Sequence, residues 1–384
     1  MKLHAIKEHE QKKALNSWAH NNYRGSIIAG TGFGKSRCGV LAINHVLNVA
    51  GGSSALVLVP TIQLQEQFKE EFTKWECKNC LDKVEVMCYQ SAHKLRNKQY
   101  DIVVCDEIHL GLSEKYRDFF KYNVYNRILC MTATLPEEPR YKLELYKIAP
   151  VIYQITLDEC VEIGIVSPYE IHCMPIELTD EERADYKRIN NEFVTHKMAL
   201  EPNAFDFAKT ALKSPNVSYD IKQHAVGFYK TIRERKAIVD KAHNKVKVFK
   251  NLVYNNLGQK IITFGGLNEF TDTLAESVAP LAEVYHSKIP KKKRTEALRR
   301  FREGEVDILC STKALNQGFD VPGASLGIVC GLTSKALSMV QRVGRLVRFK
   351  EGKIGRVYVL YVKDSQEEKW LKNATWDLDR VKWL

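Results

Sequence analysis

The stretch Ala29-Gly-Thr-Gly-Phe-Gly-Lys-Ser36 decides the fold, because it joins an apolar run to a segment with helical spacing. The run at Ser26–Ala29 is typical of a buried strand, and the apolar residues of Lys35–Leu47 recur at helical intervals. A glycine-rich turn between a strand and a helix lets backbone N–H groups point at phosphate oxygens. The stretch departs from the strict phosphate-loop pattern, since Ala29 stands where that pattern has glycine. A glycine-rich turn that serves packing alone is the alternative.

A second stretch, Asp106-Glu-Ile-His109, follows another apolar run about seventy residues later. In an ATPase site, Lys35 supplies positive charge to the β- and γ-phosphates, and the Ser36 hydroxyl ligates Mg²⁺. Asp106 would hold the same ion through water, and Glu107 would orient the attacking water. The two stretches together predict a site for ATP and Mg²⁺. Its phosphate cradle would consist of Ala29, Gly30, Thr31, Gly32, Phe33, Gly34, Lys35 and Ser36.

The composition indicates a globular protein with a polyanionic partner. The chain has 384 residues, enough for two domains with separate cores, and 45% of them are hydrophobic. The net charge of +12 favours nucleic acid, although charge alone does not distinguish DNA from RNA or an acidic protein. No apolar run approaches the length of a membrane span, and the first residues lack the apolar core of a signal peptide. We therefore expect a soluble, cytoplasmic protein.

The ten cysteines are expected to be reduced core thiols, because many of them lie inside strand-like apolar runs. Cys77-Lys-Asn-Cys80 is the only C-x-x-C pair, and no second pair follows at metal-ligand spacing. We therefore favour a structural role for this pair over a zinc site.

Two series of strand-like runs predict an α/β fold with two tandem lobes. Up to about residue 150, apolar runs alternate with helical patterns, which is typical of a parallel sheet with helices on both faces. A second series begins near Lys260. Between them, residues 178–256 are charged and rich in helix formers, and Thr179-Asp-Glu-Glu182 fits a helix start.

We expect Pro202, Pro215 and Gly227 to break this middle region into several helices. The region therefore reads as a helical insertion that joins the lobes. We divide the chain into a first lobe, a linker with the helical insertion, and a second lobe, at residues 1–165, 166–256 and 257–384.

A third stretch, Gln341-Arg-Val-Gly-Arg-Leu-Val-Arg348, places Arg342, Arg345 and Arg348 on one helical face. Such a face suits triphosphate oxygens, and an arginine from a second domain can stabilise charge on the transferring γ-phosphoryl group. Hydrolysis would then depend on how the two lobes close. A basic, solvated helix end is the alternative.

These stretches occur in the same order as the motifs of superfamily 2 helicases of the DExH type, and the sequence resembles that family over nearly its whole length. Ala29–Ser36 is similar to motif I of that family, Asp106–His109 to motif II and Gln341–Arg348 to motif VI. Five further stretches resemble motif Ia, a following nucleic-acid contact motif, and motifs III, IV and V, in that order: Val59–Gln63, Tyr89–Ser91, Thr132–Thr134, Ile261–Gly265 and Ser311–Asp320. The resemblance implies two RecA-like lobes that bind ATP in the cleft between them.

The resemblance also implies further nucleotide-site residues, with the last two as finger arginines: Gly318, Asp320, Gln341, Arg345 and Arg348. Gln11 lies where the family has its adenine-reading glutamine, although Glu10 stands in place of the usual preceding aromatic residue. An amide offers both a donor and an acceptor to the adenine edge. A solvated helix residue is the alternative for Gln11.

Three short phrases look more like double-stranded-DNA translocases and branch-migrating helicases than DEAD-box RNA helicases: Gly164–Tyr169, Tyr285–Ser287 and Gly331–Ser334. The Asp-Glu-Ile-His sequence agrees with this reading, and the compact chain is loosely similar to phage helicases of the UvsW kind. The resemblance therefore favours DNA over RNA as the partner.

Polar residues after the strand-like runs suit contacts to nucleic-acid phosphates, which fix register without reading sequence. They are Thr61, Gln63, Gln90, Ser91, Ser311 and Thr312. Helix capping is the alternative role for such residues. The basic run Lys288–Arg294 reads as a solvated loop, with a DNA-facing role as its alternative.

The sequence thus favours an ATP-dependent DNA helicase or translocase that acts on duplex, forked or branched DNA. Three alternatives stay open: an RNA helicase, an ATP-switched module that remodels nucleic-acid complexes without unwinding, and a motor subunit that serves another chain.

Overall fold

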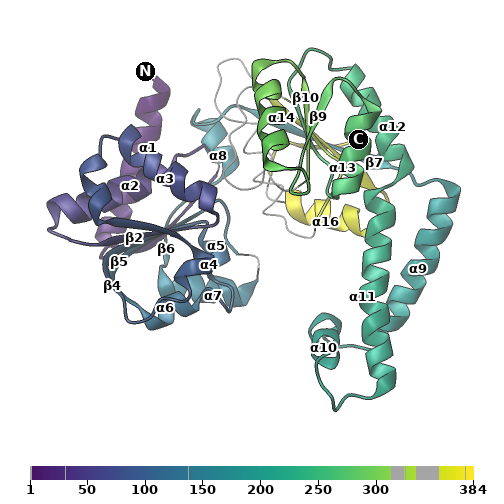
Figure 1. Cartoon of the computed structure of the whole chain (residues 1–384), viewed down its shortest axis with the longest axis horizontal. Coiled ribbons are helices and arrows are strands. Elements are labelled where there is room, and N and C mark those ends of the chain that lie inside the picture. The colour runs from purple at the N-terminus through teal and green to yellow at the C-terminus, as the bar shows by residue number, and fades with distance from the viewer. Residues whose placement is uncertain are drawn as a thin grey trace.

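The strands form two separate parallel sheets, as the alternation of apolar runs predicted. The computed structural model describes residues 2–30, 32–136, 138–312, 324, 326–333, 354–376 and 378–384. Within these residues each lobe has one sheet, and the lobes lie side by side with a helical arm that projects from the second (Figure 1). The expected α/β fold with two tandem lobes is confirmed.

The first sheet has the strand order β3-β2-β4-β5-β1-β6, and its described pairings are parallel. Its strands are β1 (Arg24–Ala29), β2 (Ala55–Val59), β3 (Val84–Cys88), β4 (Gln99–Asp106), β5 (Val124–Thr132) and β6 (Val151–Ile155). Its helices are α1 (Lys2–His20), α2 (Lys35–Asn44), α3 (Ile62–Lys74), α4 (Tyr89–Ala92), α5 (Ile108–Gly111), α6 (Asp118–Tyr122), α7 (Pro139–Ile148) and α8 (Leu157–Glu162). A π-helical turn extends α2, and a 3₁₀ turn precedes β3, at His45–Val49 and Lys78–Lys83.

Helices cover both faces of this sheet, which explains why its strands read as continuous apolar runs. Figure 1 shows α1, α2 and α3 on one side of the sheet and α4, α6 and α7 on the other. In β2, Val57 packs into one core, whereas Leu56 and Leu58 pack into a second core with Leu145 of α7. Because successive residues of a strand point to opposite faces, every residue of such a strand is buried.

The second sheet has the order β13-β7-β12-β11-β8-β10-β9, again with parallel pairings in the part that the structure describes. Its strands are β7 (Tyr169–Ile176), β8 (Ile261–Phe264), β9 (Ala282–Tyr285), β10 (Ile308–Ser311), β11 (Leu326–Val329), β12 (Gly355–Val362) and β13 (Val381–Trp383). Its described helices are α12 (His243–Tyr254), α13 (Asn268–Ser277), α14 (Lys291–Glu303) and α16 (Gln366–Thr375).

Part of the range 166–256, which we expected to be linker and helical insertion, belongs to the second lobe. β7 lies in that range, yet it pairs with β12 along its whole length. Helix α12 also lies there, and its Phe249 and Val253 are fully buried in the core of the second lobe. The insertion itself is therefore confined to the helices between β7 and α12.

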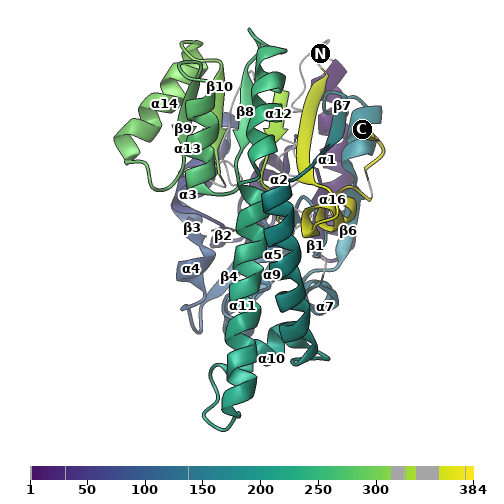
Figure 2. The same cartoon turned by 90° about the vertical axis from the view of Figure 1, so that its right-hand side faces the viewer.

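These helices form the arm, which consists of α9 (Asp180–Met198), α10 (Ala204–Ala211) and α11 (Tyr219–Asp240). Helices α9 and α11 run side by side away from the second sheet, with α10 near their far end (Figure 2). The expected helix start is present, since the Thr179 side chain and Glu182 form a reciprocal capping box. The breaks expected at Pro202 and Pro215 fall between helices.

The break expected at Gly227 was wrong, because this glycine lies inside α11. Its role is close packing: a Cβ placed on Gly227 would lie 2.2 Å from Nε2 of His196 in α9. Reading Lys288–Arg294 as a loop was also wrong in part, because Lys291–Arg294 form the first turn of α14.

The cysteines are free and buried, as their apolar surroundings predicted. Among the described residues, no group of three His, Cys, Asp or Glu side chains could hold a metal ion by itself. None of the described helices is long and apolar enough to span a membrane.

Candidate nucleotide site and nucleic-acid interface

The candidate residues of the first lobe gather at one edge of its sheet. The phosphate loop, which is the stretch Ala29–Ser36, begins at the end of β1. Asp106 ends β4 and Glu107 follows it, and these two residues are the acidic pair. Thr132 ends β5. Parallel strands carry their carboxyl ends at a common edge, and ligands of such sheets bind outside that edge. The order β4-β5-β1 therefore brings the acidic pair within two strands of the phosphate loop.

Two glycines of the phosphate loop have backbone angles that favour glycine. Gly32 and Gly34 take φ values of 97° and 91°, a left-handed region that residues with a side chain rarely adopt. Lys35 Nζ donates to the Ala29 carbonyl oxygen at 2.7 Å and lies 3.5 Å from that of Gly30. The lysine charge is thus held inside the loop that would receive phosphate oxygens. Phe33 anchors the loop, because its ring is fully buried.

Helix α1 supports this loop through Gln11, whose side chain is only 3% exposed. Its amide nitrogen donates to the Phe33 carbonyl oxygen at 2.7 Å, and Arg37 Nη1 donates to its amide oxygen at 2.7 Å. The Arg37 guanidinium in turn lies 4.4 Å from the centre of the Trp75 ring. The solvated alternative for Gln11 was therefore wrong, while its reading of adenine stays a prediction. No sequence motif pointed to Arg37.

The acidic pair is held by residues of strand β5 and of the short helices α4 and α5. Glu107 takes φ 48°, and non-glycine residues in this left-handed region cluster at functional sites. The Thr132 hydroxyl donates to Glu107 Oε2 at 3.3 Å and lies 3.1 Å from Nδ1 of His109. Tyr89 Oη donates to the Asp106 carbonyl oxygen at 2.9 Å. The stretches that resemble motifs II and III are thus in direct contact.

The two carboxyl groups differ in their affinity for a proton. Burial raises the pKa of Asp106 to about 7, and the charge of Glu107 adds to this effect while Lys35 opposes it. Burial also acts on Glu107, but the hydrogen bond from His109, the charges of Lys35 and His109, and the Thr132 hydrogen bond outweigh it and lower its pKa. Such a separation assigns different roles to two neighbouring carboxyls.

The residues present fit a magnesium ion. Mg²⁺ prefers hard oxygen ligands and few protein groups, and the site offers the Ser36 hydroxyl in the first turn of α2 and the Asp106 carboxylate. A cation beside Asp106 would favour its charged form and so oppose the effect of burial on its pKa.

The candidate nucleic-acid contacts fall into three groups. Gln63, Gln90 and Ser91 are exposed and follow the carboxyl ends of the adjacent strands β2 and β3. Thr61 is the N-cap of α3, and its side chain accepts from the backbone N–H of Leu64 at 3.4 Å, which is the capping role named as its alternative.

In the second lobe, Ser311 and Thr312 are 0% and 6% exposed at the end of β10. The Ser311 hydroxyl oxygen is buried and has no hydrogen-bond partner among the residues that the structure describes. Several predicted residues lie outside the described residues: Thr31, Gly318, Asp320, Gln341, Arg345 and Arg348.

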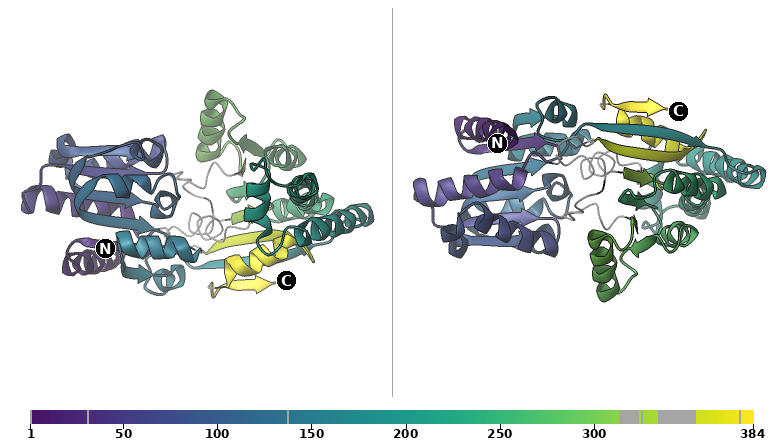
Figure 3. Two further views of the ribbon diagram at one scale, coloured as in Figure 1. Left: turned by 90° about the horizontal axis from the view of Figure 1, so that it is seen from below. Right: turned by 90° about the horizontal axis from the view of Figure 1, so that it is seen from above.

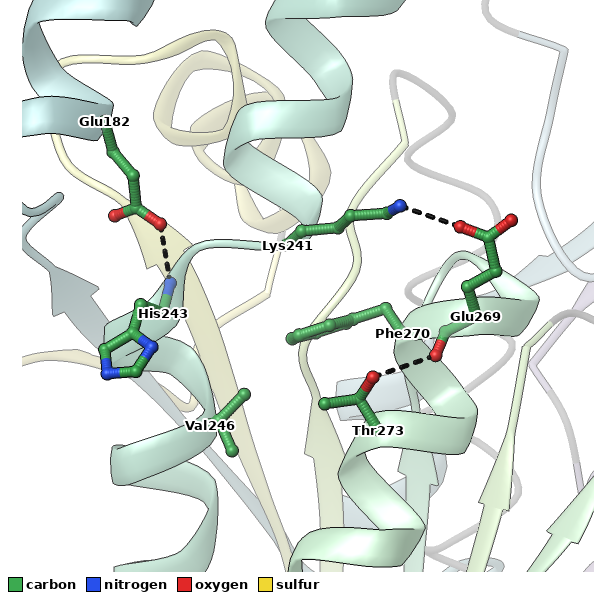
Figure 4. Close-up of a pocket in the computed structure, with 7 residues that line it drawn as sticks. All are labelled: Glu182, Lys241, His243, Val246, Glu269, Phe270 and Thr273. Atoms are coloured by element: carbon green, nitrogen blue, oxygen red, sulfur yellow. Dashed lines mark hydrogen bonds and ion pairs between the residues drawn. The ribbon is translucent and has the colours of Figure 1, made fainter.

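A separate hollow of about 320 Å³ lies at the root of the arm (Figure 4). Lys241 Nζ donates to Glu269 Oε2 at 2.7 Å across it, and Glu182 accepts from the backbone N–H of His243 at 2.9 Å. The Lys241–Glu269 pair is neutral overall, and Glu182 is already engaged by the backbone of the protein. Its lining residues are Glu182, Lys241, His243, Val246, Glu269, Phe270 and Thr273.

The sequence of each lobe matches a known protein family. The family "Type III restriction enzyme, res subunit" matches residues 4–137, and "Helicase conserved C-terminal domain" matches residues 244–350. The first match covers the phosphate loop and the acidic pair, and the second covers β8 to β11 of the second sheet and the Gln341–Arg348 stretch.

Similar proteins include a DNA translocase and RNA helicases. The DNA 3'-5' translocase XPB2 of Sulfurisphaera tokodaii is 27% identical over 89% of this chain and 78% of its own length. The DEAD-box ATP-dependent RNA helicase CshA of Bacillus cereus is 24% identical over 51% of this chain, which spans only 34% of that protein. In structure, the Hef helicase domain of Pyrococcus furiosus superposes with a TM-score of 0.56 and 16% identity, over 93% of this chain and 96% of that domain.

Proposed function

Because these matches indicate a superfamily 2 helicase or translocase, we propose that this chain is an ATP-dependent DNA motor that acts on duplex, forked or branched DNA. One observation carries the proposal most directly. Lys35, Asp106 and Glu107 lie at one edge of the first sheet, and the Lys35 charge acts on both carboxyls. A cation, a metal-binding carboxyl and an ionised carboxylate around a phosphate loop are what hydrolysis of a nucleoside triphosphate requires.

The hydrolytic roles follow from the contacts of each side chain. Lys35 would exchange the carbonyl oxygens of Ala29 and Gly30 for the β- and γ-phosphate oxygens of ATP. Glu107, kept ionised by its surroundings, would accept a hydrogen bond from the attacking water and so orient it. Mg²⁺ held by Ser36 and Asp106 would neutralise charge on the phosphoryl oxygens. Arg345 and Arg348 of the second lobe would complete the site.

The preference for DNA rests on the extent of the matches, because charge does not distinguish the two nucleic acids. The DNA translocase matches 89% of this chain, whereas the RNA helicase matches 51%. Both kinds of nucleic acid would satisfy the net charge of +12. An RNA helicase is the second candidate, because CshA resembles this chain at 24% identity.

The second lobe offers a basic surface for the polyanion. Helix α14 begins with Lys291, Lys292, Lys293 and Arg294, and no acidic residue lies in its first turn. Positive charge at a helix N-terminus is unfavourable in isolation, because the helix dipole is positive there. A phosphate backbone beside this turn would be attracted both by the basic side chains and by the helix dipole, and would so offset that repulsion.

The test compares ATP hydrolysis with single-stranded DNA, duplex DNA, a forked junction and RNA at equal nucleotide concentration and fixed salt. Forked or duplex DNA should stimulate the rate most, and binding should weaken steeply with salt because phosphate neutralisation releases counterions. Glu107→Gln should bind ATP but lose turnover, whereas Lys35→Ala should lose both, which ties the rate to this site.

Other results would lead to the alternatives. RNA-selective stimulation would move the protein to the RNA helicases. Stimulation by both nucleic acids without strand displacement or translocation would favour the ATP-switched module. Near-parental hydrolysis by Glu107→Gln would show that the acidic pair is not the hydrolytic group.

A further inference from the structure

The segment that connects the lobes packs directly on the phosphate loop. This connecting segment, residues 157–168, runs from α8 of the first lobe to the start of β7 in the second sheet. A Cβ placed on Gly32 would lie 2.6 Å from Cγ1 of Val166, and one placed on Gly30 would lie 3.5 Å from Cα of Leu157. Val166 is 1% exposed and Leu157 is 4% exposed. A shift of the phosphate loop must therefore move the connecting segment as well.

The same segment is fastened to the second lobe by one carboxylate. Asp158 lies in the first turn of α8, and its side chain is 8% exposed. Tyr169 Oη, at the start of β7, lies 2.9 Å from both Asp158 oxygens, and the backbone N–H of Asp379 donates to Oδ2 at 3.1 Å. Arg380 Nε lies 3.5 Å from Oδ1. Three groups of the second lobe thus converge on one residue of the first.

The last strand of the chain completes this connection. β13 follows Arg380 and pairs in parallel with β7, with Val381 opposite Ile171. The backbone N–H of Ile171 also donates to the Arg380 carbonyl oxygen at 2.9 Å. Figure 3 shows β7 leading from the side of the first lobe into the second sheet, with the end of the chain beside it. Asp158 therefore holds both β7 and the segment before β13.

Both oxygens of the buried Asp158 side chain have partners. A buried carboxylate is costly unless it is paired and hydrogen-bonded, and its three partners provide both. Burial and the Asp158 charge raise the pKa of Tyr169, so its hydroxyl remains a donor at neutral pH. An amide at this position would place an NH₂ group against one of these donors.

We propose that Asp158 is a positioning residue for hydrolysis, which fixes the second lobe to the connecting segment and so transmits occupancy of the phosphate loop to it. The proposal rests on the proposed function, since the reaction it positions is ATP hydrolysis. Asp158 touches neither the phosphate loop nor the acidic pair in the contacts given above. Its effect passes through the connecting segment on one side and through β7 and β13 on the other.

The test uses the full chain and three variants. Asp158→Asn removes the charge, Tyr169→Phe removes one donor with little change of shape, and Glu162→Gln alters an exposed carboxylate of the same helix as the control. Fluorescent labels at Glu70→Cys in α3 and Glu276→Cys in α13 report the distance between lobes. Selective labelling is feasible because both positions are exposed while the native cysteines are buried.

The expected result separates binding from turnover. Asp158→Asn and Tyr169→Phe should bind a non-hydrolysable ATP analogue with the parental affinity but lower the nucleic-acid-stimulated kcat about tenfold or more, since small misplacements of catalytic groups are costly. The analogue should shift the label distance in the parent and in Glu162→Gln, but not in these two variants. If Asp158→Asn fails to fold, Tyr169→Phe decides the question by the same measurements.

Two outcomes remain distinct from this result. A parental kcat and a parental distance shift in both folded variants would overturn the positioning role. A parent protein that hydrolyses no ATP would instead contradict the proposed function. In that case the label distance without nucleotide still tests Asp158, because its distribution should broaden in Asp158→Asn and not in Glu162→Gln.

Discussion

At the scale of single residues, the ionisation of Glu107 depends both on a residue close in sequence and on residues from other strands and loops of the first lobe. His109 follows two positions later, but Thr132 comes from the next strand of the sheet and contacts both Glu107 and His109. A general base or water-orienting carboxylate must be both charged and fixed in direction. Thr132 contributes to both requirements, because its hydrogen bond is one cause of the lowered Glu107 pKa.

We therefore predict that Thr132→Val lowers the stimulated kcat about tenfold to hundredfold, while ATP affinity changes little. Valine keeps the shape of threonine and removes only the hydroxyl that reaches Glu107. Steady-state kinetics and binding of a fluorescent ATP analogue give the two quantities. Thr132→Ser is the matched control and should retain most of the rate, since it keeps the hydroxyl. Equal rates for valine and threonine would remove Thr132 from the hydrolytic arrangement.

At the scale of elements, the arm depends on a close approach of α9 and α11. Gly227 of α11 faces the His196 ring of α9, and Nδ1 of His196 lies 3.1 Å from Nδ1 of His224. Glycine inside a helix costs about 1 kcal/mol relative to alanine. Here a side chain on residue 227 would overlap the imidazole, so packing decides which residue is the more stable.

Gly227→Ala should accordingly destabilise the arm, because overpacking costs about 1–3 kcal/mol and exceeds the gain in helix propensity. Amide hydrogen exchange in α9 and α11 is the suitable measurement, since an arm can open without global unfolding. Adding His196→Ala should restore protection, because it removes the atoms that collide. Unchanged protection in the single variant would mean that the histidine ring moves aside without cost.

The paired histidines also predict a dependence on pH. Burial and the neighbouring His224 lower the pKa of His196 below its ordinary value of 6.5, while Glu192 opposes them. The unfolded arm then binds a proton more readily than the folded arm, so stability is lost as pH falls through the ordinary range of histidine. Hydrogen exchange in α9 and α11, corrected for intrinsic rates, should rise between pH about 7.5 and about 5.5.

His196→Gln should flatten that dependence, while exchange in the buried strand β2 should serve as the unchanged reference. A dependence that persists in His196→Gln would assign it to another group.

The sequence was sufficient for the elements that are buried on both faces. β2 begins and ends where its apolar run does, because a doubly covered parallel strand contains few polar residues. β7 was missed, since its residues alternate in burial and include Pro175. β13 was missed because three partly exposed residues become a strand only by pairing with β7.

The candidate site divides in the same way. The glycines and Lys35 follow a local pattern with a physical reason, so their spacing predicted the loop that the structure shows. Asp158 belongs to no such pattern, because its proposed role depends on contacts such as the one with Asp379, which is 221 residues away in sequence. Arg37 likewise acquires its role from Gln11 of another helix. Contacts between residues so far apart in sequence can be identified only once the fold is known.

At the scale of the whole molecule, the proposed reaction needs groups from both lobes. The phosphate loop and the acidic pair belong to the first lobe, while Arg345 and Arg348 follow β11 of the second in sequence. An arginine delivered across an interface makes hydrolysis depend on closure, and this is how a motor can link chemistry to movement. The contacts of Asp158 show that the two lobes are already joined at one side of the connecting segment.

We predict that Arg345→Ala and Arg348→Ala each lower the nucleic-acid-stimulated kcat by about 10³-fold or more, as finger arginines do, because charge on the transferring phosphoryl group is left uncompensated. ATP affinity should change far less, since the first lobe retains Lys35 and the phosphate loop. Arg356→Ala, an exposed arginine on β12, is the control for loss of positive charge in the same lobe. If the three variants hydrolyse ATP equally well with forked DNA present, the Gln341–Arg348 stretch is a basic helix end and closure of the lobes does not complete the site.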